Sequence, residues 1–333
     1  MHPSRSAAVL VLAAALVPSC GGGSGSAPPS PSAPPGTPAP APSPEPPLFA
    51  PYIDVTDDPP FSMTGMAATT GHKHYTLAFI QDGGSCLPEW GGGIPLSQNY
   101  YADQIDALRS KGGDVIVSFG GAAGVDLATR CASPEALQAA YQAVLDPYRF
   151  TTIDLDVEGS PLTDTPSIDR RNKALRALEL ANPGLRVNYT LPVDPAGLGS
   201  DGLNLLQNAV ANGTRVDVVN VMAMDYGGPR ADMGRDAVSA AQGTQTQITS
   251  LGLSSAVGVT VMIGQNDEAG EIFDLTNADT LLTFAKANHY VALLSFWSAG
   301  RDNGGCPGQT VASSTCSGIA QSDFAFSNKF KSF

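Results

Sequence analysis

The stretch TTIDLDVEG at residues 151–159 alternates acidic with aliphatic side chains, and this alternation decides how the chain folds around it. Side chains of a β-strand point to opposite faces in turn, so Asp154, Asp156 and Glu158 share one face and the aliphatic residues share the other. In a parallel barrel the aliphatic face packs under helices and the acids point toward the barrel axis. Glu158 then lies nearest the carboxyl-terminal rim, where such barrels carry their active sites.

Short apolar runs recur along the whole chain, and helix-like stretches separate most of them. Eight runs rich in β-branched or aromatic residues are the predicted strands: Tyr52–Val55, Tyr75–Ile80, Val115–Phe119, Thr152–Asp156, Leu185–Thr190, Val216–Met222, Ala256–Met262 and Tyr290–Phe296. The predicted helices are Tyr101–Ser110, Pro134–Leu145, Ile168–Leu180, Leu203–Ala211, Arg235–Ser250 and Asp279–Asn288. Strands that alternate with helices favour parallel pairing, so the pattern predicts one α/β domain folded as a single (β/α)8 barrel. An open doubly wound sheet is the alternative, but no glycine-rich phosphate loop follows the first strand.

Length and composition agree with one folded domain. Of the 333 residues, 42% are hydrophobic and 15% are charged, which is typical of a globular protein and excludes a fully disordered one. Residues 49–333 are the predicted barrel domain and have the size of one such barrel. The formal net charge of −13 repels phosphate groups, so the sequence predicts no nucleic-acid partner.

Residues 1–48 have a composition that cannot form part of a core. Arg5 precedes an apolar run, Ala7 to Val17, that is too short to span a bilayer, and this pattern predicts an export signal over residues 1–20. Cys20 stands where such a signal is cut, an arrangement similar to bacterial lipoprotein signals in which the cysteine carries lipid; plain secretion is the alternative. Residues 21–48, rich in Pro, Ser and Gly, predict an extended linker. We therefore expect an extracellular or cell-surface protein.

The cysteine count supports export. Four cysteines remain beside Cys20, and an even number in an exported chain favours two disulfides. Cys306 and Cys316 flank a short loop and are expected to pair, which leaves Cys86 with Cys131. A zinc site is the alternative, but the sequence has neither a CxxC pair nor a histidine cluster beside the cysteines. We therefore predict no metal and no cofactor.

The three acids of the decisive stretch point to proton chemistry. Repulsion between carboxylates this close disfavours ionisation of all three, so at least one is expected to hold a proton near neutral pH. A protonated carboxyl at the rim of a barrel is a general acid. A calcium site and a solvated edge strand are the other interpretations. Calcium more often takes its ligands from a loop, and the aliphatic residues between the acids indicate burial of the opposite face.

The stretch also resembles the acid-rich strand of the family-eighteen glycoside hydrolases, the chitinase family, which is usually written DGxDxDxE. Asp154, Asp156 and Glu158 match the last three acidic positions of that motif. Thr151 and Thr152 stand where the family has its first Asp and its Gly, so the match is incomplete at that end.

Three other segments carry the same resemblance. SFGG at residues 118–121 resembles the SxGG of the third strand, and MAMDY at residues 222–226 resembles the MxYD of the sixth. Phe296 and Trp297 end the eighth predicted strand, where the family has a tryptophan floor. The likeness extends from about Tyr52 to Asp302 and implies a chitinase-like catalytic domain over residues 49–333.

What the resemblance implies is hydrolysis of β-1,4-linked N-acetylglucosamine polymers with retention, in which the acetamido oxygen of the substrate attacks the anomeric carbon. Glu158 protonates the leaving oxygen and then activates water, while Asp156 orients the acetamido group. Asp154 tunes Asp156, and Tyr226 donates a hydrogen bond to the acetamido oxygen. Strand alternation brings Tyr226 to the site if the sixth strand continues, whereas Asp225 needs a bend at the strand end.

Aromatic side chains are the expected platforms for sugar rings. Trp297 is the predicted floor, and Phe79 and Trp90 are predicted to line outer subsites, while Tyr100 and Tyr101 are expected to pack against each other. The complete set of predicted substrate-binding residues is Trp297, Asp225, Met222, Met224, Phe79, Ser118 and Gly120.

Two other functions stay open at this point. A carbohydrate-binding protein of the same fold lacks turnover, although such members have lost the acid that Glu158 retains here. An enzyme that cleaves the chitobiose core of N-glycans uses the same acids on a different polymer. The predicted partner is therefore chitin or another N-acetylglucosamine polysaccharide, bound by a monomer that contacts a membrane only if Cys20 is lipidated.

Overall fold

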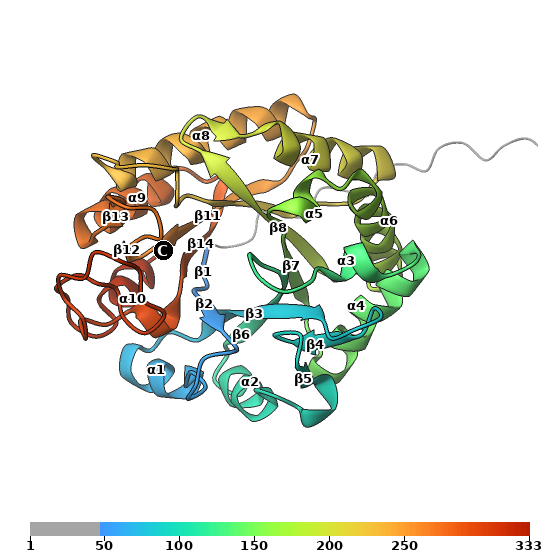
Figure 1. Ribbon diagram of the computed structural model, residues 1–333, viewed down its shortest axis with the longest axis horizontal. Helices are drawn as coiled ribbons and strands as arrows, with labels where there is room; N and C mark the ends of the chain where they lie inside the picture. The colour runs from blue at the N-terminus through green and yellow to red at the C-terminus, as the bar shows by residue number, and fades with distance from the viewer. Residues whose placement is uncertain (1–46) are drawn as a thin grey trace, which may run out of the picture. The chain divides into compact units, whose positions relative to one another are not determined.

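Eight parallel strand positions form a closed ring in the computed structural model, which describes residues 47–333. In ring order they are β1 (Leu48–Phe49) with β2 (Tyr52–Asp54), β3 (His74–Asp82), β6 (Asp114–Gly120), β7 (Thr152–Asp156), β8 (Arg186–Asp194), β10 (Val218–Met222), β11 (Ala256–Met262) and β14 (Val291–Trp297). Helices surround this ring (Figure 1). All eight predicted strands are present, so the (β/α)8 barrel is confirmed.

One short segment closes the ring. Leu48 of β1 pairs with Leu293 of β14, and Tyr52 of β2 pairs with Thr76 of β3, both in parallel. The predicted linker over residues 21–48 is therefore wrong at its last residue, because Leu48 already forms part of the sheet. The predicted export signal, Cys20 and the rest of the linker up to residue 46 lie outside the described residues.

All six predicted helices are present, with ends that differ by a few residues. The helices around the barrel are α1 (Met63–Thr70), α2 (Ala102–Arg109), α4 (Pro134–Tyr148), α6 (Thr165–Ala181), α7 (Ser200–Asn212), α8 (Met233–Ser250), α9 (Leu275–Ala287) and α10 (Ala325–Phe330), with the single turns α3 (Leu127–Arg130) and α5 (Ser160–Thr163). Sequence patterning missed α1, which contains Gly65 and three threonines, all poor helix formers. Complete burial of Met63 and Met66 against the sheet stabilises it.

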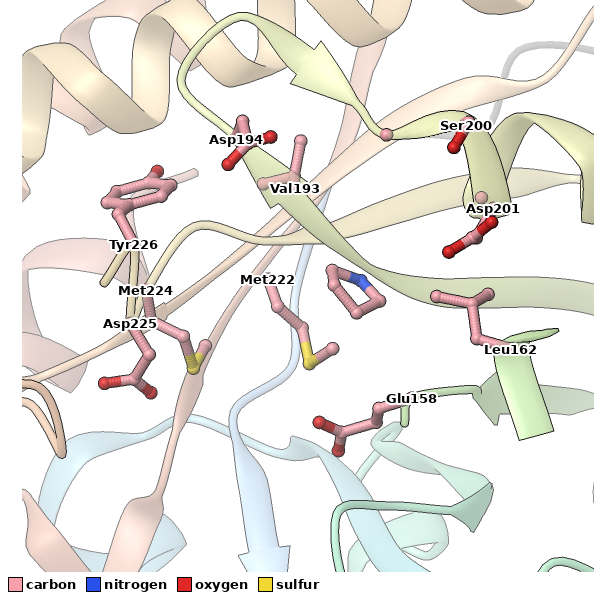
Figure 2. A pocket seen from close by; sticks show the side chains of 13 residues that line it. Glu158, Leu162, Val193, Asp194, Ser200, Asp201, Met222, Met224, Asp225 and Tyr226 are labelled. Carbon is pink, nitrogen blue, oxygen red and sulfur yellow. The ribbon is translucent and has the colours of Figure 1, made fainter. Parts of the chain in front are cut away.

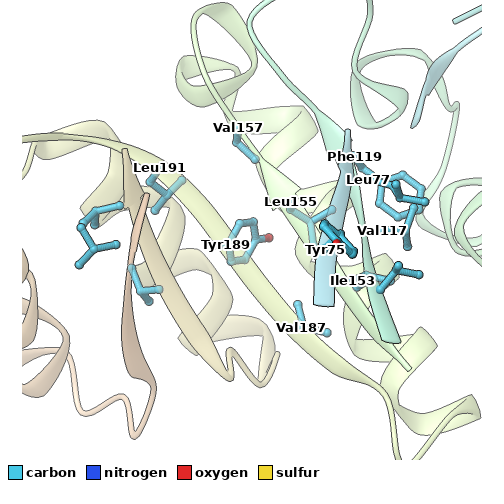
Figure 3. Packing of buried hydrophobic residues seen from close by; sticks show 14 of the residues in the cluster. Tyr75, Leu77, Val117, Phe119, Ile153, Leu155, Val157, Val187, Tyr189 and Leu191 are labelled. Atoms are coloured by element: carbon cyan, nitrogen blue, oxygen red, sulfur yellow. The ribbon is translucent and has the colours of Figure 1, made fainter. Parts of the chain in front are cut away.

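The aliphatic face of β7 packs under the helices, as the alternation predicted. Ile153, Leu155 and Val157 are at most 1% exposed and belong to the main hydrophobic cluster. In Figure 3 they lie with Val187 and Tyr189 of the neighbouring strand β8. Burial of each such side chain contributes about 1.5–3 kcal/mol. This packing fixes the register of β7, and the register turns the intervening acids toward the barrel axis.

Short strands lie in the loops between the main elements. They are β4 (Pro88–Trp90) with β5 (Ile94–Pro95), β9 (Gly197–Leu198), and β12 (Gly264–Gln265) with β13 (Ile272–Phe273).

Both predicted disulfides are confirmed: Cys86 bonds Cys131 with their Cα atoms 4.7 Å apart, and Cys306 bonds Cys316 at 6.0 Å. No helix within residues 47–333 has the length and apolar character needed to cross a bilayer.

Candidate active site

Asp154 sits inside the barrel and accepts three hydrogen bonds from three different strands. Its donors are the hydroxyls of Tyr52 on β2 at 2.9 Å, Ser118 on β6 at 2.7 Å and Thr190 on β8 at 2.6 Å. Burial raises the pKa of Asp154, while all three hydrogen bonds act in the opposite direction. Asn220 of β10 extends this buried network by donating to Thr190 at 2.9 Å. A hydrogen-bonded polar layer thus supports the acids from below.

Asp156 lies two residues further along the same strand face and is 5% exposed. Its Oδ1 has no hydrogen-bond partner among residues 47–333. Burial raises the pKa of Asp156 well above its ordinary value, and the charges of Glu158, Asp154 and Asp126 raise it further. A buried carboxyl with one free oxygen and such a pKa holds a proton readily and is ready to bind a ligand group.

Glu158 follows the end of β7 and reaches the rim. Burial raises its pKa, and the negative charge of Asp225 adds to this effect. Gly159, the next residue, has a φ of 57°, so the chain turns away directly after the glutamate and leaves its side chain at the mouth of the barrel. A glutamate with a raised pKa at this place meets the requirements of a general acid.

Two adjoining cavities meet at Glu158. The inner pocket has a volume of about 290 Å³, and the outer pocket has a volume of about 430 Å³. Glu158, Met222, Met224 and Asp225 line both. The inner pocket is lined by Tyr52, Phe79, Ala122, Asp156, Glu158, Thr190, Met222, Met224, Asp225, Thr260, Met262, Asp267 and Trp297. The cavities therefore form one cleft that passes the candidate acid.

An aromatic surface forms one wall of the inner pocket. Trp297 stacks with Phe79 at a ring distance of 5.8 Å and an angle of 13°, and Tyr52 lies 6.2 Å from the Trp297 ring. Trp297, the predicted floor, and Phe79, which was predicted to line an outer subsite, thus both line the inner pocket with Asp156 and Glu158. Flat aromatic surfaces of this kind fit the apolar faces of sugar rings.

Glu158 lies at one edge of the outer pocket (Figure 2). The wall of this pocket includes Asp194 at the end of β8, Asp201 in the first turn of α7, and Tyr226. The Tyr226 ring lies near Asp194, across the pocket from Glu158. Its hydroxyl has no hydrogen-bond partner within the described part of the chain, and burial raises its pKa.

The end of the sixth barrel strand differs from the simplest expectation. Strand β10 stops at Met222, and Asp225 has a φ of 51°, in the left-handed region. The chain bends there, so the alternation that was expected to bring Tyr226 to the acids does not continue. Asp225 lines the inner pocket with Asp156, whereas Tyr226 lines only the outer one. The backbone N–H of Tyr226 instead donates to Glu271 at 3.0 Å.

Three sequence predictions fit the structure less well. Ser118 is completely buried and bonds Asp154 without lining either pocket. Gly120 also lies outside both linings; a Cβ there would stand 2.0 Å from the Asp156 carbonyl oxygen, so glycine allows β6 to approach β7. Trp90, a predicted subsite residue, is 0% exposed and donates to the Tyr148 hydroxyl at 3.0 Å. Trp90 ends β4, and its ring packs in the core against Tyr148 and Phe150.

Several residues at the site were not predicted. Tyr52, Thr190, Asn220 and Thr260 form or extend the polar network inside the barrel. The available signal was a single polar residue within an apolar strand, such as the asparagine in VVNVM at residues 218–222. Asp267 was missed because it lies in a loop between β12 and β13, where no periodicity applies.

Within residues 47–333, no three His, Cys, Asp or Glu side chains are grouped to hold a metal ion.

No protein-family model matches the chain. It is 32% identical over 311 residues to the probable bifunctional chitinase/lysozyme of Escherichia coli (strain K12), with 86% of this chain and 34% of that protein covered. It is also 32% identical over 279 residues to Endochitinase 11 of Metarhizium anisopliae, with 77% and 52% covered. The chain thus spans about a third and about half of the lengths of these curated relatives.

Solved structures give a fuller match. The catalytic domain of a hyperthermophilic chitinase from Pyrococcus furiosus is 33% identical, with a TM-score of 0.77 and with 85% of this chain and 93% of that chain covered. A GH18 chitinase from Pseudoalteromonas aurantia shares the fold at 13% identity, with a TM-score of 0.55 and with 75% and 93% covered. The predicted resemblance is confirmed at the level of the family. The chain belongs to the chitinase family of glycoside hydrolases.

Proposed function

We propose that the protein hydrolyses chitin or chitin oligosaccharides, polymers of β-1,4-linked N-acetylglucosamine, with retention of configuration. The observation that carries this proposal is Asp156, a buried carboxyl that lines a pocket with an aromatic wall and a neighbouring glutamate, and whose Oδ1 has no hydrogen-bond partner among residues 47–333. The chitinases named above support the choice of polymer.

The acetamido group of the substrate is the proposed nucleophile. Retaining enzymes that use two carboxyl groups hold them about 5–5.5 Å apart on either side of the sugar. Asp156 and Glu158 instead lie two residues apart at the end of β7, with Cα atoms about 7 Å apart by strand rise, so both reach the pocket from the same strand end. Asp156 is therefore poorly placed to attack from the opposite side of the ring, and well placed to accept the acetamido N–H.

The proposed reaction has two steps. Glu158 donates its proton to the glycosidic oxygen while the acetamido oxygen attacks the anomeric carbon, so the C–O bond to the leaving sugar breaks and a cyclic oxazolinium ion forms. Asp156 stabilises that cation in a pocket with little access to water. Glu158, now a carboxylate, takes a proton from water, and the resulting hydroxide opens the ring to restore the β configuration. The raised pKa of Glu158 suits this exchange.

The remaining site residues have supporting roles in this scheme. Asp154 places a second negative charge under Asp156, held by Tyr52, Ser118 and Thr190. Tyr226 is proposed to donate a hydrogen bond to the substrate, and its position favours a sugar in the outer pocket over the acetamido group beside Asp156.

Hydrolysis of defined substrates tests the proposal. The purified protein is incubated with chitin oligosaccharides and, separately, with an N-glycosylated protein, and the products are identified by mass. We expect chitin oligosaccharides to be cleaved, and Glu158→Gln to lower turnover by about two to four orders of magnitude. Glu135→Gln on the exposed start of α4 is the matched control and should retain full activity.

Three outcomes of that experiment would contradict the proposal. Release of N-glycans without cleavage of chitin oligosaccharides would identify an endo-N-acetylglucosaminidase. Binding of oligosaccharides without turnover would identify a carbohydrate-binding protein. Full activity of Glu158→Gln would remove the proposed acid from the mechanism.

We also propose that the protein acts outside the cytoplasm, attached to a membrane by lipid on Cys20. The support is the sequence of residues 1–48 and the two disulfides of the domain, which are typical of exported proteins. Secretion without lipid is the alternative, and fractionation of a Cys20 variant distinguishes the two.

A further inference from the structure

A buried ion pair lies outside the barrel, between its helices and the catalytic strands. Arg171 of α6 is 0% exposed, and its Nη2 donates to Asp126 Oδ2 at 2.9 Å. The other oxygen of Asp126 accepts from the backbone N–H of Ala128 at 2.6 Å and caps α3. Nε and Nη1 of Arg171 have no hydrogen-bond partner among residues 47–333. Burying a guanidinium in this way is costly for folding, so the pair calls for an explanation beyond stability.

The pair stands next to the strand that carries the acids. Asp126 ends the loop that follows β6, and Ala122 of the same loop lines the inner pocket. The backbone N–H of Gly121 donates to the Asp156 carbonyl oxygen at 3.1 Å. A Cβ on Gly120 would stand 2.0 Å from that carbonyl oxygen and 3.7 Å from Asp126 Oδ2. The carboxyl of Asp126 and the backbone of Asp156 therefore both lie close to the Cβ position of one glycine.

Negative charge is already concentrated at this place. Asp154, Asp156 and Glu158 occupy one strand face, and Asp225 faces Glu158 from the end of β10. The charge of Asp126 acts on Asp156 as well, and raises its pKa. In a buried setting an unpaired charge acts over such distances much more strongly than it does in water.

We propose that Arg171 is a positioning residue for the reaction. By pairing with Asp126 it offsets the negative charge of that carboxylate, which would otherwise act on the two reacting carboxyls, Asp156 and Glu158. The proposal rests on the proposed function, because it assigns those two carboxyls to catalysis. Arg171 touches neither pocket and acts only through Asp126 and the field of the pair.

Within the described chain, the other groups packed around the pair have partners of their own or stay neutral, so we assign the offsetting of the Asp126 charge to Arg171. From α4 and β8, Tyr141 and Tyr189 face the guanidinium, and burial raises the pKa of both phenols, so they stay neutral. From α3, Arg130 pairs with Asp82 at 3.7 Å. The neighbouring Arg170 donates to the carbonyl oxygen of Ala128.

The test is the pH dependence of kcat/KM for a chitin oligosaccharide. Arg171→Met leaves Asp126 unpaired, and we expect both limbs of the profile to move to higher pH by about half a unit or more. Arg171→Lys keeps the charge and should leave the limbs near their wild-type positions. The double variant Arg171→Met with Asp126→Asn removes both charges and should return the limbs. Arg176→Met removes another cation from α6, whose partner is Glu179, and should move neither limb.

A purely structural role predicts something else. If Arg171 only stabilises the fold, Arg171→Met should have a lower melting temperature and a lower maximum of kcat/KM, while both limbs of the pH profile stay in place. That result would overturn the proposal. If Arg171→Met does not fold, Asp126→Asn alone decides: Asn still caps α3, and the limbs should move to lower pH because Arg171 then acts unopposed. Unmoved limbs in that variant would equally overturn the proposal.

Titration of the Asp156 carboxyl by ¹³C NMR in the same variants measures the same displacement without substrate. A wild-type protein that fails to cleave chitin oligosaccharides would contradict the proposed function alone. Unshifted carboxyl titrations would contradict the role of Arg171 alone.

Discussion

Replacing Ser118 by alanine removes one of the three hydrogen bonds that favour the charged form of Asp154, and changes little else. The hydroxyl of Ser118 is completely buried and donates to Asp154 Oδ2 at 2.7 Å. Tyr52 and Thr190 keep their contacts in the variant. A hydrogen bond to a charged group contributes about 1.5–3 kcal/mol, and one pKa unit corresponds to about 1.4 kcal/mol. The pKa of Asp154, already raised by burial, should therefore rise further.

The sign of the stability change follows from this direction. In the folded protein the pKa of Asp154 lies above its ordinary value, so ionisation of this group opposes folding as pH rises through the window between the unfolded and folded values. Ser118→Ala extends that window upward. Below it the variant loses only a neutral hydrogen bond, about 1 kcal/mol, and above it the loss reaches ~1.5–3 kcal/mol. The stability difference between variant and wild type should therefore grow with pH.

Urea unfolding from pH 4 to pH 8 measures the stability difference, and kcat/KM over the same range measures the effect on the site. We expect the acidic limb of kcat/KM to move to higher pH, because the coupled carboxyls then bind a proton at higher pH. Ser327→Ala is the matched control, since Ser327 donates to the buried Asp302 at 2.6 Å away from both pockets. It should lose stability without moving the limb. A stability difference independent of pH, or an unmoved limb in Ser118→Ala, would refute this reasoning.

Three further predictions concern the substrate, the disulfides and the anchor. Trp297→Ala removes the stacked wall of the inner pocket, so KM for chitin oligosaccharides should rise at least tenfold while circular dichroism shows an unchanged fold. Thiol labelling of the purified protein, denatured without reductant, should find all four domain cysteines oxidised; labelled Cys86 or Cys306 would argue against the pairing. Cys20→Ser should move the protein from the membrane fraction to the medium, and unchanged fractionation would leave simple secretion.

The barrel was predictable because its strands and its helices each carry a sequence signal of their own. The runs at Val216–Met222 and Ala256–Met262 are apolar and β-branched, as strands buried on both faces are. The helices between them carry their own periodicity. Helix α1 escaped because its stability comes from burying Met63 and Met66, which propensity does not report.

The site was predictable only where regular structure positions it. Asp154 and Asp156 are inside β7, so alternation places them correctly. The rule failed at Asp225 and Tyr226, because β10 ends before them and a left-handed residue redirects the chain. Trp90 shows a related limit: it ends β4, a strand of three residues that is too short for its sequence to show which face is buried.

The hydrogen-bond network under the acids was beyond the reach of sequence reasoning. Tyr52 and Asp154 are separated by 102 positions, and Tyr52 and Asn220 by 168. Only closure of the barrel brings such residues together. A lone polar residue in an apolar strand indicates that some partner exists, but it does not say which one.

The anomeric form of the first product tests the central claim most directly. Rapid ¹H NMR of a chitin oligosaccharide, recorded within the first turnovers and before mutarotation, reports the configuration at the newly formed reducing end. Attack by the acetamido oxygen followed by water on the opposite face predicts the β-anomer. Appearance of the α-anomer first would mean a single inverting displacement, and the proposed roles of Asp156 and Glu158 would then be contradicted.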